Sequence, residues 1–220
     1  MFSAYLAIFT AGWQELCMNR LEMRNLHCGY STSLLSISSL TLEQGQHLLL
    51  YGPNGIGKST FLKTVAGILK PLAGSVTFQG KSPHHAKAIT RAIMYVPETI
   101  ELPEFLTPVE YIHLVAEFYG EQPERKRIED GLAFFDVEAF ARLPIQRASQ
   151  GQKRRIQLLA VYVLHRPLTL LDDPLIGIDA NGKPYLDALV RSLTQDGILL
   201  MTARESLSNF NALDIKTFAA

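Results

Sequence analysis

The chain has 220 residues, of which 47% are hydrophobic and 19% are charged. That is enough for one sizeable core, or for one domain with a small appendage. Basic and acidic residues both number 21, so the net charge is zero and we expect no nucleic-acid partner. The two cysteines, Cys17 and Cys28, lack zinc-ligand spacing and are interpreted as small hydrophobic residues of a protein from a reducing compartment.

The first segment, MFSAYLAIFTAGWQELC, is apolar and contains one charge, Glu15. Its apolar core of about ten residues is shorter than the roughly 20 that span a bilayer, and it lacks the basic start of a signal peptide. It fits an interfacial tail, or an upstream extension of a protein that begins at Met18 or Met23. We favour the extension and assign it to residues 1–20.

Strand and helix patterns then alternate along the chain. Strand signals lie around Leu35 and Ile37 and at 48–51, 75–80, 92–96, 168–172, 198–202 and 214–218. Helical patterns lie at 58–69, 108–119, 124–135 and 180–193. Unbroken apolar strands between helices predict an α/β fold with a buried parallel sheet. The stretch from 97 to 149 has no strand signal, which predicts a helical subdomain inserted into this core.

The most informative stretch is GPNGIGKST at 52–60, directly after a buried strand and before a helix. It satisfies the pattern G-x-x-x-x-G-K-[ST], in which glycines let backbone N–H groups surround an anion at a helix N-terminus. The alternative is a glycine-rich turn that precedes a lysine by chance. We predict a phosphate-binding loop made of Gly52, Pro53, Asn54, Gly55, Ile56, Gly57, Lys58, Ser59 and Thr60. Lys58 is expected to hold the β and γ phosphates during catalysis, and Ser59 to bind Mg²⁺.

Two adjacent carboxylates, Asp172 and Asp173, follow the apolar run 168–171. Mg²⁺ prefers oxygen ligands, so an acid delivered beside the phosphate loop predicts Asp172 as the magnesium ligand. Asp173 points elsewhere and is predicted to polarise the attacking water as a general base. Without the phosphate loop, a solvated turn continued by Pro174 would be the better interpretation.

With a third motif, ASQGQKRR at 148–155, the sequence resembles the ATP-binding subunits of ABC transporters over about residues 21–205. The motif looks like the family signature LSGGQ, which opens a helix. Ser149 is a good N-cap for that helix. The apolar residues of the helix fall on one face: Ile156, Leu159, Ala160 and Val163.

The resemblance implies a head-to-tail dimer, either homodimer or heterodimer, in which each signature closes on the ATP held by the other subunit. It thereby assigns three signature residues to ATP binding: Ser149, Gly151 and Gln152. The basic triplet at 153–155 opposes the helix dipole and suits an anion site, whereas a solvated charged face is the alternative.

Other positions are carried over from the resemblance one at a time. Tyr30 resembles the aromatic residue that stacks on adenine, with a turn tyrosine as the alternative. Glu98 replaces a glutamine that touches magnesium, and we assign it both catalytic and metal-binding roles. Asp173 replaces the usual catalytic glutamate, and Asp179 matches the aspartate of the loop that crosses the dimer interface. Ala203 stands where the family has a switch histidine, and its methyl group can neither orient water nor bind phosphate.

The fold class implied is α/β, a phosphate-loop NTPase of the ABC type with a parallel or mixed sheet core, an antiparallel β region and an inserted helical subdomain. Residues 21–220 then form one domain. Within it, 21–97 and 150–220 form the RecA-like core with the β region, and 98–149 form the helical subdomain.

The function implied is ATP hydrolysis, with ATP and Mg²⁺ as cofactors, coupled to export of an unassigned substrate through a separate transmembrane permease subunit. This places the chain at the cytoplasmic face of the inner or plasma membrane. The run at 95–120 resembles bacterial exporter subunits, and DDPLIGIDANG resembles the haem-exporter subunits of cytochrome c maturation. Two alternatives stay open: a non-transport ATPase of the same superfamily, and an ATP-binding module, altered at 173 and 203, that pairs with an active partner.

Overall fold

The computed structural model describes residues 19–176, 183–208 and 210–219. Its strands are β1 (Arg20–Gly29), β2 (Ser33–Glu43), β3 (His47–Tyr51), β4 (Ala73–Phe78), β5 (Ile93–Val96), β6 (Leu168–Leu171), β7 (Ile198–Ala203) and β8 (Ala212–Asp214). Its α-helices are α2 (Lys58–Val65), α3 (Lys87–Thr90), α4 (Pro108–Tyr119), α5 (Arg125–Phe134), α6 (Gln150–Leu164) and α7 (Lys183–Leu193). Short 3₁₀ helices are η1 (Glu138–Phe140), η2 (Ile145–Arg147) and η4 (Ile215–Phe218).

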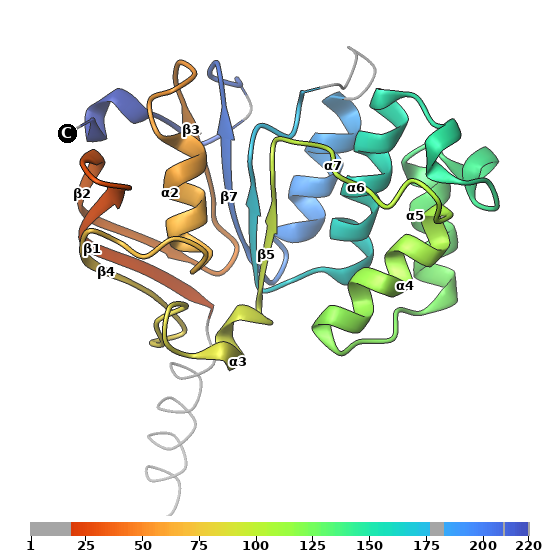
Figure 1. Cartoon of the computed structure of the whole chain (residues 1–220), viewed down its shortest axis with the longest axis horizontal. Helices are drawn as coiled ribbons and strands as arrows, with labels where there is room; N and C mark the ends of the chain where they lie inside the picture. The colour runs from red at the N-terminus through yellow and green to blue at the C-terminus, as the bar shows by residue number, and fades with distance from the viewer. Residues whose placement is uncertain (1–18, 177–182, 209, 220) are drawn as a thin grey trace, which may run out of the picture.

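A five-stranded parallel sheet forms the centre of the fold, with the strand order β5-β6-β7-β3-β8 (Figure 1). In a parallel sheet the carboxyl ends of all strands lie at one edge, which is where ligands bind in such folds. The loops that follow β3, β5, β6 and β7 therefore gather at this edge, although they are far apart in the sequence.

The sheet is buried on both faces, as its unbroken apolar runs predict. In β3, Leu48 and Leu50 join one hydrophobic cluster while Leu49 joins the other, and all three side chains are at most 2% exposed. Helices α4 to α7 cover one face, and α2 with the smaller sheet covers the other (Figure 1). The predicted parallel sheet core and inserted helical subdomain are confirmed.

The smaller sheet is antiparallel, with the order β2-β1-β4, and confirms the predicted antiparallel region. Strand β1 was not predicted from the sequence. Its start alternates regularly, with Leu21 and Met23 buried, but Asn25 has a φ of 45° and the register with β4 shifts between Arg24 and His27. This irregularity breaks the two-residue period on which strand prediction depends.

The helical region between β5 and α6 contains α4 and α5 with η1 and η2. Helix α4 has the bounds predicted from the sequence. Thr107 and Glu110 form a reciprocal capping box at its start, and Gly120, with a φ of 73°, ends it. Each boundary thus has a local chemical cause that can be read from the sequence.

The predicted strand at 214–218 is wrong for its last four residues. Strand β8 ends at Asp214, whose side chain accepts the N–H of Lys216 at 2.9 Å and starts the 3₁₀ turn of η4. Ile215 follows and is fully buried, so the apolar pattern reports burial rather than an extended backbone.

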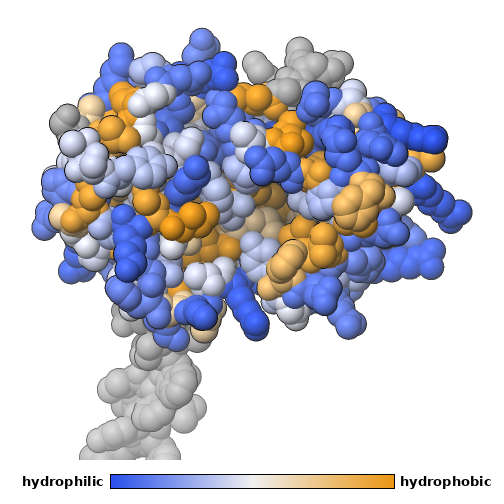
Figure 2. Space-filling model, in the orientation of Figure 1, coloured by the Kyte–Doolittle hydropathy of each residue, from blue (hydrophilic) through white to orange (hydrophobic). Residues whose placement is uncertain are grey.

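The face drawn in Figure 2 carries both hydrophilic and hydrophobic residues, and the hydrophilic ones predominate. Among the described helices, none has both the length and the apolar character that crossing a bilayer requires. Three predictions fall wholly or partly outside the described residues: the N-terminal extension up to residue 18, the interface residue Asp179 and residues 180–182 of the helix predicted at 180–193.

Candidate nucleotide-binding site

The predicted phosphate loop connects the end of β3 to the start of α2. Gly55 and Gly57 have φ angles of 82° and 111°, a backbone region that glycine adopts without strain. Gly57 is the N-cap of α2, and a Cβ at this position would lie 3.1 Å from the Cβ of Leu34. The loop therefore turns sharply and presents the positive N-terminal end of α2 toward its interior.

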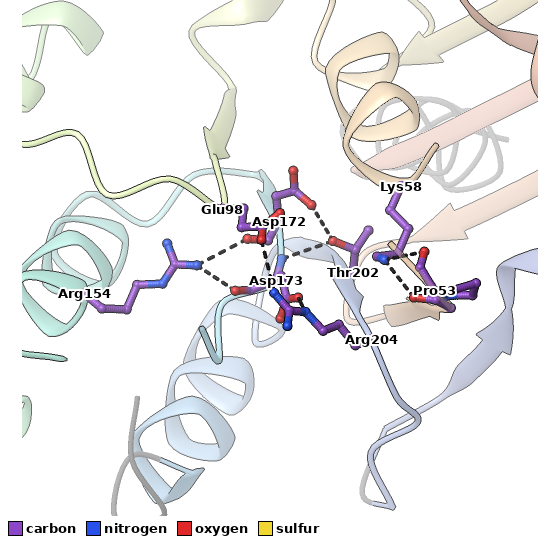
Figure 3. Close-up of polar contacts among 9 residues, drawn as sticks. Pro53, Lys58, Glu98, Arg154, Asp172, Asp173, Thr202 and Arg204 are labelled. Carbon is purple, nitrogen blue, oxygen red and sulfur yellow. Dashed lines mark hydrogen bonds and ion pairs between the residues drawn. The ribbon is translucent and has the colours of Figure 1, made fainter. Parts of the chain in front are cut away.

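Lys58, the first residue of α2, is 7% exposed. Its Nζ atom donates to the carbonyl oxygens of Gly52 at 2.7 Å and Pro53 at 3.0 Å (Figure 3). An ammonium group held by two neutral carbonyls, with no carboxylate among these hydrogen-bond partners, remains available to an anion.

A cavity of about 280 Å³ lies beside this lysine. Its walls come from the loop, from the start of β2 and from the residue after Pro97: Leu34, Asn54, Gly55, Gly57, Lys58, Ser59, Thr60 and Glu98. The structure thus brings Glu98 to the phosphate loop, although Glu98 lies 40 positions after Lys58 in the sequence. Tyr30 lies in the turn between β1 and β2 and is 65% exposed, and its stacking on adenine stays a prediction.

Asp172 follows the last residue of β6 and is 2% exposed. Its Oδ1 accepts the hydroxyl of Thr202 at 2.7 Å, and its Oδ2 accepts the hydroxyl of Tyr95 at 3.3 Å. Burial, and then the charge of Asp172, raise the pKa of Tyr95, so this phenol stays a neutral donor. The Asp172 carboxylate is therefore held in place by donors from both neighbouring strands, β5 and β7.

Asp173 has a φ of 43°, a left-handed conformation that is uncommon for a residue other than glycine. Its N–H donates to the Thr202 hydroxyl at 3.1 Å, so one hydroxyl holds both acids. Its Oδ2 lies 3.3 Å from Nε of Arg204. Burial raises the pKa of Asp173, and the positive charge of Arg204 opposes that rise.

Arg154 of helix α6 is fully buried and organises the same region (Figure 3). Its guanidinium donates to the carbonyls of Asp173 at 2.7 Å, Asp172 at 3.3 Å, Pro174 at 3.2 Å and Pro97 at 3.0 Å. It also donates to Oε1 of Gln157 at 2.5 Å. One side chain thus ties the signature helix to the acid loop and to the segment that carries Glu98.

The interpretation of the basic triplet at 153–155 as an anion site is therefore wrong for its side chains, and so is the solvated-face alternative. Arg154 binds backbone carbonyls, and Lys153, which is 8% exposed, pairs with Glu104 at 2.5 Å. Arg155 pairs with Asp136 at 3.0 Å and lies over the ring of Tyr185. All three cations are bound within their own chain.

The predicted N-cap of α6 is confirmed. Ser149 Oγ accepts the N–H of Gln152 at 3.3 Å, and the side chain of Gln152 accepts the N–H of Ser149 at 2.8 Å. The predicted apolar face of this helix is buried. Contacts of Ser149, Gly151 and Gln152 with the ATP of a second subunit stay a prediction.

Three residues of the site were not predicted: Tyr95, Thr202 and Arg204. Thr202 is fully buried in the otherwise apolar strand β7, and a buried hydroxyl needs partners, which is the one signal that its sequence offers. Arg204 follows Ala203, whose carbonyl accepts the N–H of Gly52 at 3.1 Å. No motif marks Arg204; its place next to the acids comes from the strand order alone.

The oxygen groups in this region fit Mg²⁺, which prefers carboxylate and hydroxyl oxygen and usually keeps several waters. Asp172 is buried, its hydrogen-bond donors among the described residues are two hydroxyl groups, and both Ser59 and Glu98 line the loop cavity. Within the described ranges, no three acidic, histidine or cysteine side chains form a metal cluster by themselves.

The fold and the loop geometry define an α/β domain of the phosphate-loop type. The family described as ABC transporter matches residues 35–176, which is more than half of the chain, and the chain belongs to this family.

Known relatives agree with this assignment. The cytochrome c biogenesis ATP-binding export protein CcmA of Escherichia coli strain K12 is 29% identical over 194 residues, covering 87% of this chain and 92% of CcmA. A solved Pyrococcus furiosus protein, described as an ABC transporter ATP-binding protein, is 31% identical with a TM-score of 0.85, covering 91% and 100% of the two chains. A dimeric ATP-binding cassette bound to ADP and phosphate has a TM-score of 0.74 at 22% identity, covering 84% and 88%, a likeness of fold alone.

Proposed function

We propose that this chain is the ATP-binding subunit of an ABC exporter and that it binds and hydrolyses Mg-ATP at the site described above. The observation that carries the proposal is the meeting of three separate segments at one edge of the sheet. The phosphate loop with Lys58, the Glu98 segment and the acids Asp172 and Asp173 surround one region, as a phosphoryl-transfer site requires.

The phosphate loop and the helix N-terminus bind the phosphates of ATP. Backbone N–H groups of the loop surround the anion, and Lys58 exchanges its two carbonyl partners for the β and γ phosphates. Tyr30, exposed at the β1–β2 turn, offers a ring for stacking on the adenine base.

Hydrolysis then needs a positioned water and a base. A water oxygen attacks the γ phosphorus, the bond to the oxygen that bridges the β and γ phosphates breaks, and the products are ADP and phosphate. Asp173 accepts the proton of the water, and its raised pKa makes it a better proton acceptor than an exposed aspartate. Ser59, Asp172 and Glu98 would hold Mg²⁺, which neutralises charge on the phosphates.

Two partners follow from this function. A second ATP-binding subunit, the same chain or another, would place its signature helix against the bound ATP; the capping box that orders the start of α6 supports this role. A transmembrane permease would contact the helical region, which exposes Phe105 and Phe118 and contains a cavity of about 610 Å³ between α4 and α5. The chain would then act at the cytoplasmic face of the membrane. The likeness to CcmA supports export as the direction of transport.

An ATP-binding module with little hydrolysis is the competing function. Ala203 favours it, because a methyl group stands where the family has a histidine, and so does the shorter reach of Asp173. Measured turnover separates the two functions, since both require ATP binding.

Nucleotide binding and partner capture test the proposal. We expect Lys58→Ala to abolish binding of a fluorescent ATP analogue. Lys63→Ala, which removes another lysine of helix α2, should bind like the unmodified chain. Loss of binding in both variants would contradict the assignment of Lys58 to the nucleotide site. Co-purification from membranes should recover a polytopic membrane protein. Recovery of no membrane protein would contradict the proposed permease partner.

A further inference from the structure

We infer that Arg204 is a positioning residue for ATP hydrolysis and holds Asp173 and Glu98 in their working orientation. The inference rests on the proposed function, because it assigns a role within the same hydrolytic site. Neither the sequence motifs nor the family resemblance marks this residue.

The position of Arg204 follows from the strand order. Strand β7 lies between β6, which leads to the acids, and β3, which leads to the phosphate loop. Arg204 follows the last residue of β7, so its side chain starts between these two functional loops. The hydrogen bond from Gly52 N–H to the carbonyl of Ala203, 3.1 Å long, fixes the backbone there against the start of the phosphate loop.

The guanidinium of Arg204 spans two acids that come from different segments (Figure 3). Its Nε lies 3.3 Å from Oδ2 of Asp173, and its Nη2 lies 3.5 Å from Oε1 of Glu98. Among the described residues, Arg204 is the one side chain that pairs with either carboxylate. Asp172 differs, because hydroxyl groups of two neighbouring strands hold it.

The two halves of this arrangement differ in exposure: the pair with Glu98 lies at the surface, with side chains 54% and 43% exposed, whereas the pair with Asp173 reaches a buried acid. The side chain of Asp173 is only 7% exposed, and Glu98 lines the phosphate-loop cavity. The site contains three carboxylates, and the cation of Arg154 is used by backbone carbonyls. Among the described residues, Arg204 is therefore the cation that pairs directly with carboxylate side chains of the site, whereas Lys58 donates to carbonyls of the loop itself.

The proposed action is orientation. Arg204 pairs with Oδ2 of Asp173, and Oδ1, which has no hydrogen-bond partner among the described residues, accepts the proton of the water. A short aspartate reaches a bound water only in a restricted set of rotamers, so a fixed orientation matters more here than for a longer glutamate. By fixing the orientation of Asp173, Arg204 thus helps to position the attacking water, which the methyl group of Ala203 cannot do.

Single-turnover hydrolysis and nucleotide affinity test the inference on the full-length chain. Protein in excess over Mg-ATP converts the substrate once, which makes slow hydrolysis measurable. We expect Arg204→Ala to lower the rate roughly 10–100-fold while the dissociation constant of a fluorescent ATP analogue changes less than about twofold. Arg204→Lys should recover part of the rate, because an ammonium group can still pair with one acid.

Arg125→Ala is the matched control, since Arg125 also forms an exposed pair, with Glu129 at 2.7 Å on helix α5. It should hydrolyse ATP at the unmodified rate. An unchanged rate in Arg204→Ala would overturn the inference. So would a loss of affinity as large as the loss of rate, because Arg204 would then bind nucleotide rather than position the base. Absence of hydrolysis by the unmodified chain would instead overturn the proposed function.

Discussion

Thr202 provides the sharpest test of how the acid pair is held. Its hydroxyl donates to Asp172 at 2.7 Å and accepts the N–H of Asp173 at 3.1 Å, and the residue is fully buried. Thr202→Val keeps the shape of the side chain and removes both hydrogen bonds. A bond to a charged group contributes about 1.5–3 kcal/mol, and a buried donor left unpaired costs about 1–3 kcal/mol.

Because both bonds share one hydroxyl and the added methyl group is buried among apolar residues, we expect a net loss of about 3 kcal/mol. Total stabilities of single domains are about 5–15 kcal/mol, so this is a large fraction. With a urea slope of about 2–3 kcal/mol per molar, the unfolding midpoint should fall by about 1–1.5 M. Circular dichroism during urea titration measures the shift.

Thr169→Val is the matched control. Thr169 is also fully buried, in the adjacent strand β6, but its hydroxyl reaches only the carbonyl of Arg166 at 3.5 Å. At that length little hydrogen bonding is lost, and the change should stay within about 1 kcal/mol. Equal midpoints for the two variants would refute the bridging role assigned to Thr202.

Three further predictions concern Arg154, Cys28 and Gly57. Arg154→Met should cost at least about 3 kcal/mol in urea unfolding, since it leaves several buried carbonyls unpaired, whereas Arg155→Met should cost under about 1 kcal/mol; similar values would contradict the role of Arg154. Burial raises the pKa of the Cys28 thiol to about 11. In a Cys17→Ser background, we expect the thiol of the folded protein to react with a disulfide reagent at pH 8 at least about 100-fold more slowly than the thiol of the urea-unfolded protein. Equal rates in the two states would refute the burial of Cys28. Gly57→Ala should weaken ATP-analogue binding and cost about 1–3 kcal/mol, because of its φ of 111° and the nearby Leu34; unchanged affinity would count against the loop geometry.

The sequence predicted the elements whose causes are local. Helix α4 begins at a proline after a capping threonine and ends at a glycine, so its bounds could be read directly. The buried strands of the parallel sheet were found because both of their faces are apolar. Strand β1 was missed because Asn25 interrupts its alternation, and residues 215–218 were assigned to a strand because burial of Ile215 mimics one.

Some residues of the site could likewise be predicted from local patterns, and others could not. The phosphate loop and the acid pair are contiguous motifs, and the structure places Glu98 beside the loop as the family resemblance implies. The roles of Arg154 and Arg204 depend on partners 18 to 106 residues away in the chain. Such contacts arise from the order of strands in the sheet, which no local pattern encodes.

The conversion of ATP by Asp173→Asn is the most direct test of whether this chain hydrolyses ATP with Asp173 as the base. We predict that this variant binds Mg-ATP as tightly as the unmodified chain, because the phosphate loop is intact. It should leave the nucleotide as ATP where the unmodified chain produces ADP and phosphate. Chromatography of the bound nucleotide after a single-turnover incubation distinguishes the two. Production of ADP by Asp173→Asn at the unmodified rate would contradict the assignment of Asp173 as the base.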